Sequence, residues 1–462
     1  MQDKAEGTVD HARVNGGITR GQWLAMLAAV LGWMFDGFEM GLHPLTAKPA
    51  FKELLTEPVT AELSANGATP TQADIDAAVG KAIGDWNSYC NALFLFGAAA
   101  GGLVFGWLGD RIGRTSAMMW SVLAYTLFTG LGGFATAAWH LAVFRFIAAL
   151  GMGGEWSLGV ALVMEVWPDR FRPYLAGVIG AAANLGFLLI ALVSVGITAS
   201  GADTAKSWRL LMFCGVAPAA LTFLIRLFVP ESEKWKEAVR AGADRTDAAA
   251  PPAPPSILAT LFSAAMLPRM AVAIGLSSVA LLATWGAVQW MPLWAGDVAK
   301  KAGVQTPYAP ALLQISSALG ASVGTFLAAV FAGQIGRRPA YFLLCLASLA
   351  ATGWLWRATP ENGPVFFFAV FLVGMTTASF YGWIPLYLPE LFPTRVRATG
   401  QGLAFNFGRI FAGIGNLTVT APLLAYYGGD YAQAMAGVAL VYLIGMGLIW
   451  LGPETRGRPL PE

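Results

Sequence analysis

The chain has 462 residues, of which 56% are hydrophobic and 12% are charged, and its formal net charge is only +2. A soluble globular domain carries about 25% charged residues, so this composition excludes an ordinary soluble protein. The Lys and Arg residues are scattered among short loops and form no basic tract for nucleic acid. Composition therefore predicts a protein that crosses a membrane many times.

The chain opens with a polar stretch, residues 1–22, which we expect to form a cytoplasmic tail. The first apolar segment, residues 23–45, already has the length of about 20 residues that crosses a bilayer. A polar insertion, residues 48–85, follows it and contains one modest helical stretch, residues 72–83. We therefore predict a first span and then a soluble insertion on the outer side.

Twelve segments in all have the length and apolar character of a transmembrane helix. They cover residues 23–45, 86–108, 115–136, 140–164, 173–197, 208–229, 270–295, 308–332, 340–356, 364–388, 399–426 and 431–451. A polar, Pro-rich stretch separates the first six from the last six. The sequence therefore predicts an all-α membrane protein with twelve transmembrane helices in two six-helix bundles.

The bundles are expected to occupy residues 23–230 and 269–452, with a terminal tail at 453–462. The linker between them, residues 231–268, contains the run Ala-Ala-Ala-Pro-Pro-Ala-Pro-Pro, which favours an extended chain. An even number of spans places both termini on one side, and most of the 29 Lys and Arg residues fall in the tails and loops of that side. The positive-inside rule makes it the cytoplasm, so we expect an inner-membrane protein with both termini cytoplasmic.

Three short patterns occur twice, at almost the same separation along the chain. They are Glu-x2-Pro-x3-Arg-x4-Gly, separated by 225 residues, and a Gly-Arg pair and a Pro-Glu-Ser/Thr pattern, each separated by 223 residues. The copies begin at Glu165 and Glu390, at Gly113 and Gly336, and at Pro230 and Pro453. The chain is therefore predicted to contain two copies of one unit. A parallel duplication in a membrane protein places the binding site between the two halves.

Ionisable residues inside the predicted spans indicate a functional pathway, because a charge within the bilayer is costly. At 1.5 Å per residue, Asp36 and Glu39 lie about 20 Å and about 24 Å from the cytoplasmic end of the first span. Arg145 lies about 8 Å from the outer face in the fourth span, at a similar depth. Two carboxylates on one helix face near one Arg suit proton coupling. The alternative is a static salt bridge between the first and fourth spans.

A second buried cation, Arg409, lies about 15 Å from the start of the eleventh span, near the bilayer centre. The repeat maps it onto Asn184 in the fifth span, so we expect both side chains at a central cavity. A guanidinium there suits a carboxylate, and Asn184 and Asn406 are candidates to complete the hydrogen bonds. The alternative is permanent neutralisation of Arg409 by Glu155, which lies about 22 Å from the outer face.

Further motifs lie at the ends of the spans. Gly106-x3-Asp110-Arg111-x-Gly113-Arg114 joins the second and third spans, Arg145 begins a stretch that ends in Gly151-Met152-Gly153-Gly154, and Pro453-Glu454-Thr455-Arg456-Gly457 follows the last span. With the duplication, this set resembles the major facilitator superfamily of secondary transporters. The resemblance covers nearly the whole chain. It implies two pseudo-symmetric six-helix bundles that work by alternating access.

Two shorter matches indicate a branch of that superfamily. Asp36-Gly37-Phe38-Glu39 resembles the Asp-Gly-Tyr-Asp of the aromatic-acid and sialate/lactate proton symporters, with Glu in place of the last Asp, and Gly408-Arg409 is similar to their eleventh span. The resemblance implies that the first-span acid and Arg145 carry proton coupling.

Charged residues at the cytoplasmic boundary are assigned to gating, because they can form ion pairs and cap helix ends in the outward-open state. The alternative is that they serve only as topology signals. Together with Glu155, the gating set comprises Asp110, Arg111, Arg114, Glu165, Arg172, Glu390 and Arg397.

The sequence thus predicts a proton-coupled importer of a small organic anion, a monocarboxylate such as lactate, sialate or an aromatic acid. We expect a monomer in the lipid bilayer whose partners are the substrate and protons, with no catalytic residue, cofactor, metal or nucleic acid. A proton–sugar symporter is the nearest alternative. A drug or metabolite exporter and a non-transporting membrane sensor are further ones.

Overall fold

The computed structural model describes residues 19–65, 70–112, 114–155, 171–201, 206–220, 257–294, 307–358, 363–393 and 396–458, with the single residues 163, 167, 298 and 461. The predicted linker falls mostly outside these ranges. Throughout them the regular secondary structure is helical, and no strand is present in any described segment. The all-α prediction is therefore confirmed.

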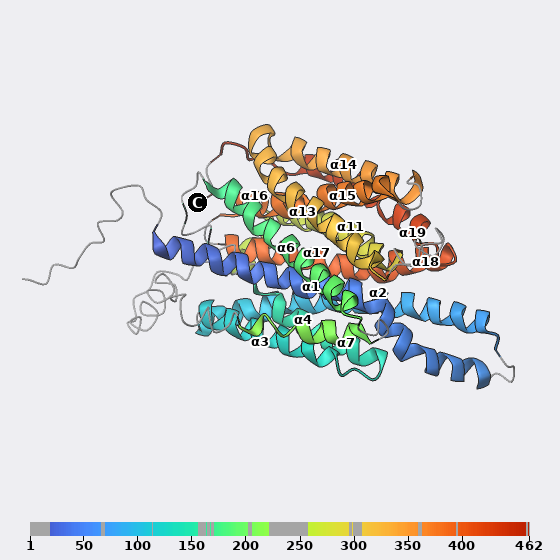
Figure 1. The fold of residues 1–462 in the computed structure, drawn as a ribbon. Coiled ribbons are helices and arrows are strands. Elements are labelled where there is room, and N and C mark those ends of the chain that lie inside the picture. The colour runs from blue at the N-terminus through green and yellow to red at the C-terminus, as the bar shows by residue number, and fades with distance from the viewer. Residues whose placement is uncertain are drawn as a thin grey trace, which may run out of the picture.

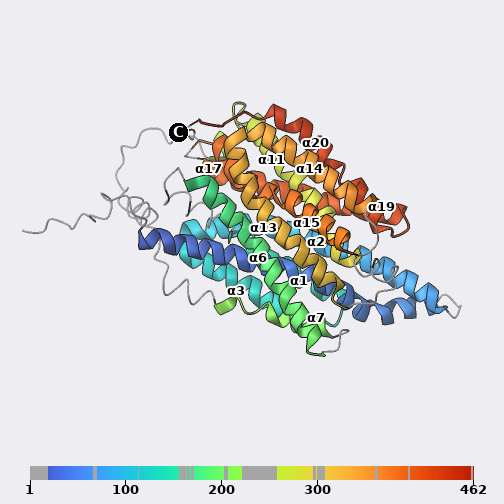
Figure 2. The same ribbon diagram turned by 45° about the horizontal axis from the view of Figure 1, so that its top comes forward.

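The helices divide into two groups that lie side by side (Figures 1 and 2). The N-terminal half contains α1 (Arg20–Ala65), α2 (Gln72–Ile112), α3 (Arg114–Gly132), α4 (Ala138–Met152), α6 (Arg172–Ala199) and α7 (Ser207–Cys214). The short α10 (Ile257–Leu261) precedes the C-terminal half. That half contains α11 (Leu267–Gly286), η3 (Val288–Trp290), α13 (Ala309–Ile335), α14 (Arg337–Ala358), α15 (Pro364–Ala378), α16 (Phe380–Leu391), α17 (Arg397–Gly415), η4 (Asn416–Thr420), α18 (Ala421–Tyr426), α19 (Tyr431–Val438), α20 (Val441–Leu448) and η5 (Ile449–Leu451).

Nine helices in the described ranges are long and apolar enough to cross a membrane. The other three predicted spans correspond to α3, α4 and α7, each of which lies within a few residues of a part of the chain that is not described. Four of the predicted spans are interrupted in the structure. The seventh passes from α11 into η3, the tenth passes from α15 into α16, the eleventh continues through the π-helical turn η4, and the twelfth combines α19, α20 and η5.

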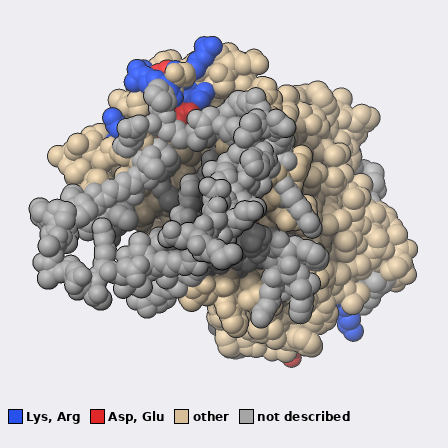
Figure 3. Space-filling view, turned by 90° about the vertical axis from the view of Figure 1, so that its left-hand side faces the viewer, with Lys and Arg blue, Asp and Glu red and all other residues tan. Residues whose placement is uncertain are grey.

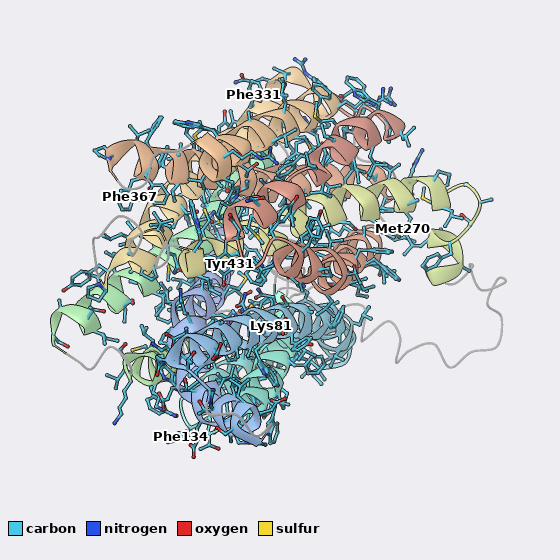
Figure 4. All side chains as sticks on the ribbon, turned by 90° about the vertical axis from the view of Figure 1, so that its right-hand side faces the viewer. Lys81, Phe134, Met270, Phe331, Phe367 and Tyr431 are labelled. Atoms are coloured by element: carbon cyan, nitrogen blue, oxygen red, sulfur yellow. The ribbon has the colours of Figure 1, made fainter. Side chains whose placement is uncertain are left out.

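The start of α1 and the C mark lie at the same end of the bundle, here named the terminal end (Figure 1). Described Lys and Arg side chains gather beside acidic ones at one edge of this end (Figure 3). The opposite end carries the projecting hairpin of α1 and α2 and is named the hairpin end. Figure 4 views that end, with Phe134 on the N-terminal half and Tyr431 on the C-terminal half.

The predicted insertion at residues 48–85 forms this helical hairpin, and its predicted helical stretch coincides with the start of α2 at Gln72. Instead of stopping near residue 45, α1 continues to Ala65 despite Pro44, Pro49 and Pro58, and α2 runs without a break from Gln72 into the bundle. The extension is held by packing, because apolar residues of both helices are buried against each other and the bundle, among them Phe51, Leu55, Val79 and Ile83. Tertiary burial thus outweighs the helix-breaking tendency of proline.

Contacts between long helices hold the halves together. α6 lies along α13 and α2 lies along α17, while α1 packs on α6 within its own half. Glycine permits the closest of these approaches: a Cβ on Gly37 of α1 would collide with the Ala183 carbonyl of α6, and one on Gly186 would collide with the Met34 carbonyl. Small residues let membrane helices pack backbone to backbone in this way.

Candidate functional site

A cavity of about 120 Å³ lies between the two halves, on the faces of α1, α2, α4 and α6 from one half and α11, α13, α15, α16 and α17 from the other. Its wall is largely apolar and aromatic, and the rings of Phe94 and Trp285 stack across the two halves with centroids 4.7 Å apart. Polar groups are few, which is typical of a small-molecule site. They include Asn184, Thr284, Gln289, Gln314, Ser317, Thr377, Tyr381 and Arg409.

Arg409 of α17 lines this cavity, as the sequence predicts, and its side chain is 9% exposed. One terminal nitrogen, Nη1, donates to the carbonyl oxygen of Ala98 at 3.3 Å and to Asn406 Oδ1 at 3.1 Å, and the guanidinium lies 4.7 Å from the centroid of the Phe405 ring. No ion pair joins it to an acidic side chain anywhere in the described ranges. A buried guanidinium without a counter-charge favours an anionic ligand.

The two asparagines predicted to assist Arg409 lie in different places. Asn184 lines the cavity, where its amide nitrogen is 3.3 Å from Thr325 Oγ1 of α13. Asn406 is buried beside Gly102 of α2, outside the cavity wall, and holds Nη1 of Arg409. Asn184 is thus placed to contact a ligand, whereas Asn406 is placed to orient the arginine.

Gln314 of α13 also lines the cavity and was not singled out from the sequence. Its side-chain nitrogen donates to the carbonyls of Gly41 and Phe187 at 3.3 Å and 3.0 Å, which leaves Oε1 buried without a donor. The sequence did contain a signal for Gln314, namely a side-chain amide within an otherwise apolar span. Burying such an amide costs free energy unless it forms hydrogen bonds.

The predicted coupling group of Asp36, Glu39 and Arg145 is divided between two places. Arg145 Nη1 lies 3.6 Å from Glu39 Oε1, which also accepts a hydrogen bond from Thr129 Oγ1 at 3.2 Å. The Arg145 guanidinium stacks 4.5 Å from the Phe94 ring centroid. Glu39 and Arg145 face a smaller pocket inside the N-terminal half and do not line the central cavity.

Asp36 has a different neighbour, Glu155 of the fourth predicted span. The two carboxyl groups are electrostatic neighbours, and a Glu155 oxygen is 2.9 Å from where a Cβ on Gly32 would stand. All four carboxyl oxygens are buried, and no hydrogen-bond donor in the described ranges reaches them. Asp36 is also close enough to interact electrostatically with Arg409. The structure therefore places Glu155 with Asp36, and no ion pair joins Glu155 to Arg409.

Of the other predicted gating residues, only Glu390 has a described side chain. Asp110, Arg111, Arg114, Glu165, Arg172 and Arg397 lie outside the described side chains. Glu390 accepts two hydrogen bonds from Arg337, with Nη2 and Nε at 2.6 Å and 2.9 Å, and one from Thr455 Oγ1 at 2.6 Å. These contacts all lie within the C-terminal half.

This cluster brings together one copy of each of the three repeated patterns. Arg337 belongs to the Gly-Arg pair, Glu390 to the Glu-x2-Pro pattern, and Glu454 and Thr455 to the Pro-Glu pattern. Glu454 accepts hydrogen bonds from the backbone N–H groups of Arg337 and Arg338 at 2.9 Å and 3.0 Å, at the start of α14. The three C-terminal copies thus form one contact site at the terminal end.

No group of three or more metal-ligating side chains occurs in the described ranges. Cys90, Cys214 and Cys345 are free thiols.

Comparison with known proteins adds to this geometry. The sequence profile described as Major Facilitator Superfamily matches residues 80–416. The chain is 25% identical to the sialic acid transporter NanX of Escherichia coli K12, over 94% of each chain, and 25% identical to the cis,cis-muconate transport protein of Acinetobacter baylyi, over 70% of this chain and 75% of that one. A solved D-xylose-proton symporter superposes with a TM-score of 0.69 at 19% identity, covering 95% of this chain and 99% of its own. The chain belongs to the Major Facilitator Superfamily, and it is a membrane transporter with the fold of that family.

Proposed function

We propose that this transporter imports a small organic anion together with a proton, by alternating access across the inner membrane, with both termini in the cytoplasm. The observation that carries the proposal is Arg409, a buried guanidinium on the wall of the central cavity with no acidic partner in the described ranges. A planar, bidentate donor in a site of low dielectric is suited to a carboxylate.

The relatives support an organic acid as the substrate class. Sialic acid and cis,cis-muconate, the substrates in the names of two of them, both carry carboxylate groups. The cavity also suits the rest of such a molecule, because aromatic rings cover its walls and Asn184 presents an amide to it. In this proposal the carboxylate binds Arg409, while Asn406 keeps the guanidinium oriented.

Coupling to protons follows from the position of Asp36. Two neighbouring buried carboxyl groups repel each other when both are ionised, so in this proposal Asp36 and Glu155 form a pair that holds a proton. An ionised Asp36 attracts Arg409 and competes with the substrate for it. Protonation of the pair removes this competition, and the substrate anion then supplies the missing negative charge. Proton binding and substrate binding therefore favour each other.

The remaining predicted residues have supporting roles in this proposal. Glu39 and Arg145 form the proton-handling group behind α1, away from the substrate cavity. Glu390 and its contacts stiffen the terminal end of the C-terminal half, and we assign the matching gating role in the other half to Asp110, Arg111, Arg114, Glu165 and Arg172, with Arg397 in the second copy.

A proton–sugar symporter is the second candidate, and one observation favours it. Amide and hydroxyl groups of Asn184, Gln289, Gln314 and Thr284 line the cavity, and such groups suit the hydroxyls of a sugar. A sugar, however, leaves the buried charge of Arg409 without compensation.

Arg409 gives the direct test. Purified wild-type protein and the variants R409K and R409Q are reconstituted in liposomes, and uptake of labelled sialate, cis,cis-muconate and xylose is measured with an inward proton gradient. Loss of charge-assisted hydrogen bonds costs about 1.5–3 kcal/mol, so we expect R409Q to lower carboxylate uptake by about 10- to 100-fold. R409K should retain part of it, because it keeps the charge and loses the bidentate geometry.

The matched control is R357Q, an exposed arginine at the end of α14 that should transport like wild type. Carboxylate uptake by R409Q at the wild-type rate contradicts the proposal. Saturable uptake of xylose alone supports the sugar symporter.

A further inference from the structure

A second, smaller pocket lies wholly inside the N-terminal half. It has a volume of about 30 Å³ and is enclosed by α1, α3, α4 and α7. Its polar lining residues are Glu39, His43, Thr46, Thr129 and Arg145, and the remainder of its wall is apolar. Neither Arg409 nor any other residue of the C-terminal half contributes to it.

Helix α1 separates this pocket from the central cavity. Trp33 and Met40 of α1 line the central cavity, whereas Glu39 and His43 line the small pocket. Consecutive positions along a helix point in different directions, so Glu39 and Met40 line different spaces. The residue that pairs with Arg145 therefore lines the small pocket and does not line the substrate cavity.

Several buried polar atoms around the pocket have no protein partner in the described ranges. They are Glu39 Oε2 and the Nε and Nη2 atoms of Arg145. A polar pocket of this size holds one or two water molecules, since about 10–15 Å³ accommodates one when polar partners are present. Water in the pocket would supply the donor that Glu39 Oε2 lacks and the acceptors that Arg145 lacks.

His43 continues the polar lining one helical turn beyond Glu39, toward the hairpin end of α1. It is buried, and its Nε2 lies 3.0 Å from Asn87 Oδ1 of α2. With Oδ1 as the acceptor, Nε2 carries the hydrogen and Nδ1 is left to accept a proton. The charged groups that face His43 are Glu39 on its own helix and Arg145 on α4, whereas α2 and α3 present the uncharged Asn87 and Thr129.

We propose that this pocket is a hydrated proton path in which His43 relays protons to Glu39, separately from the route that the substrate takes. The proposal deepens the proposed function and rests on proton symport. Residues His43 and Glu39 are four apart on one helix face, with the pocket beside them. Buried His and acidic side chains connected by water are the usual elements of a proton relay in a membrane transporter.

The relay involves only the movement of a proton. Nδ1 of the neutral imidazole takes a proton from water on the hairpin side and becomes imidazolium, while Nε2–H keeps its bond to Asn87. The proton then passes from Nδ1 through pocket water to Glu39 Oε2, which becomes a neutral carboxylic acid, and the imidazole returns to its starting state. Arg145 repels the imidazolium and Glu39 attracts it, so the proton moves on toward Glu39.

The test separates proton movement from substrate movement. Wild type, H43Q and E39Q are reconstituted in liposomes, and three quantities are measured with labelled cis,cis-muconate: accumulation driven by a pH gradient, proton influx that follows substrate addition, and counterflow at equal pH. Gln can keep a hydrogen bond to Asn87 but cannot relay a proton. We therefore expect H43Q to retain counterflow and to lose at least about tenfold in proton influx, as is typical when a proton-transfer group is removed.

Two further variants make the result decisive. N87A removes the structural bond but keeps the imidazole, so it should retain proton influx if His43 is a relay and lose it if the bond alone matters. H140Q changes a histidine at the start of α4 that does not line the pocket, and it should behave like wild type.

Each outcome has one meaning. Proton influx at the wild-type rate in H43Q, with influx lost in E39Q, overturns the relay and leaves proton symport standing. Wild-type uptake that is indifferent to a pH gradient overturns proton symport itself. No carboxylate uptake by the wild type in any of the three assays overturns the organic-anion function.

Discussion

At the scale of single residues, three buried charges differ in how they are compensated. Glu39 is ion-paired with Arg145, Asp36 lies against Glu155, and Arg409 has no acidic partner in the described ranges. An uncompensated charge in a medium of low dielectric is strongly disfavoured. In the proposed function, a proton on the acidic pair and an anion on Arg409 would together compensate these charges.

The Asp36→Asn variant tests this arrangement. The amide resembles a permanently protonated Asp36, so Arg409 stays available to the substrate anion. We expect D36N to keep carboxylate counterflow and to lose accumulation driven by a pH gradient, because the pair no longer releases its proton. Both quantities are measurable in the same liposomes.

The control for this prediction is D76N, on the exposed part of α2, which should accumulate substrate like wild type. Accumulation by D36N at the wild-type level would show that Asp36 does not take part in coupling, and would leave Glu39 as the coupling acid.

At the scale of elements, the C-terminal copy of one duplicated motif, which contains Glu454, caps the start of α14. The first backbone N–H groups of a helix lack partners within it, and Glu454 accepts from those of Arg337 and Arg338. Partial burial raises the pKa of Glu454, but the backbone N–H groups of Arg337, Arg338, Arg456 and Thr455 outweigh it and hold the pKa below its ordinary value of 4.5. The ionised carboxylate therefore stabilises this end of the C-terminal half.

The sign of the pH dependence follows from the lowered pKa. Stabilisation by Glu454 is complete above about pH 4.5 and is lost as the pH falls through the lower pKa of the folded state. Substituting a helix-capping side chain typically costs about 1 kcal/mol, so E454Q should unfold at a lower temperature than wild type at pH 7. The two melting temperatures should converge as the pH falls below about 4.5.

Thermal unfolding in detergent between neutral and acid pH checks this expectation. E62Q, on the exposed part of the α1–α2 hairpin, is the matched control and should follow the wild-type curve at every pH. A constant difference between E454Q and wild type down to the most acid pH would show that the carboxylate charge is not the cause.

At the scale of the whole molecule, the central cavity has one wall from each half. Residues of α6 and α13 meet along one side and residues of α2 and α17 along the other, so rocking of the halves can open the cavity to either face. Gln314 reaches from α13 to carbonyls of α1 and α6, and Lys48 Nζ of α1 reaches the Leu293 carbonyl at 3.3 Å. These cross-contacts must break when the hairpin end opens.

The overall charge balance gives a prediction for the complete cycle. One proton carried with one monoanion moves no net charge, so uptake of a monocarboxylate such as lactate or sialate should follow the pH gradient and ignore the membrane potential. A single net charge would gain about 2.3 kcal/mol per 100 mV, or about a 50-fold change in accumulation. Uptake is measured in liposomes with a potassium diffusion potential at constant pH, and separately with a pH gradient at zero potential.

Liposomes without protein, under the same gradients, control for passive entry of the protonated acid. A response of protein-mediated uptake to the potential would indicate a stoichiometry other than one proton for each monoanion.

Several features were predictable from sequence because they depend on local composition. The helical spans, the duplication and the position of Arg409 near the middle of the eleventh span follow from hydropathy and residue spacing alone. The Asp36–Glu155 pair was not predicted, because spacing along α1 favours Glu39 as the neighbour of Asp36. Of the hairpin, only the helical stretch from residue 72 was predicted, because the three prolines of α1 disfavour a continuous helix, whereas burial of Phe51 and Ile83 stabilises one.

The amino-acid sequence by itself determined that this protein is a duplicated, twelve-span carrier with a buried arginine, Arg409, near its centre. It could do so because a bilayer sets the length and polarity of each transmembrane segment separately. Which acid meets which base was decided only by the tertiary structure. Side chains such as Glu155 and Asp36 come from helices far apart in the chain, and their meeting depends on the rotation and close approach of those helices. That rotation is set by packing over the whole bundle. The spacing of residues along one helix carries no information about this packing.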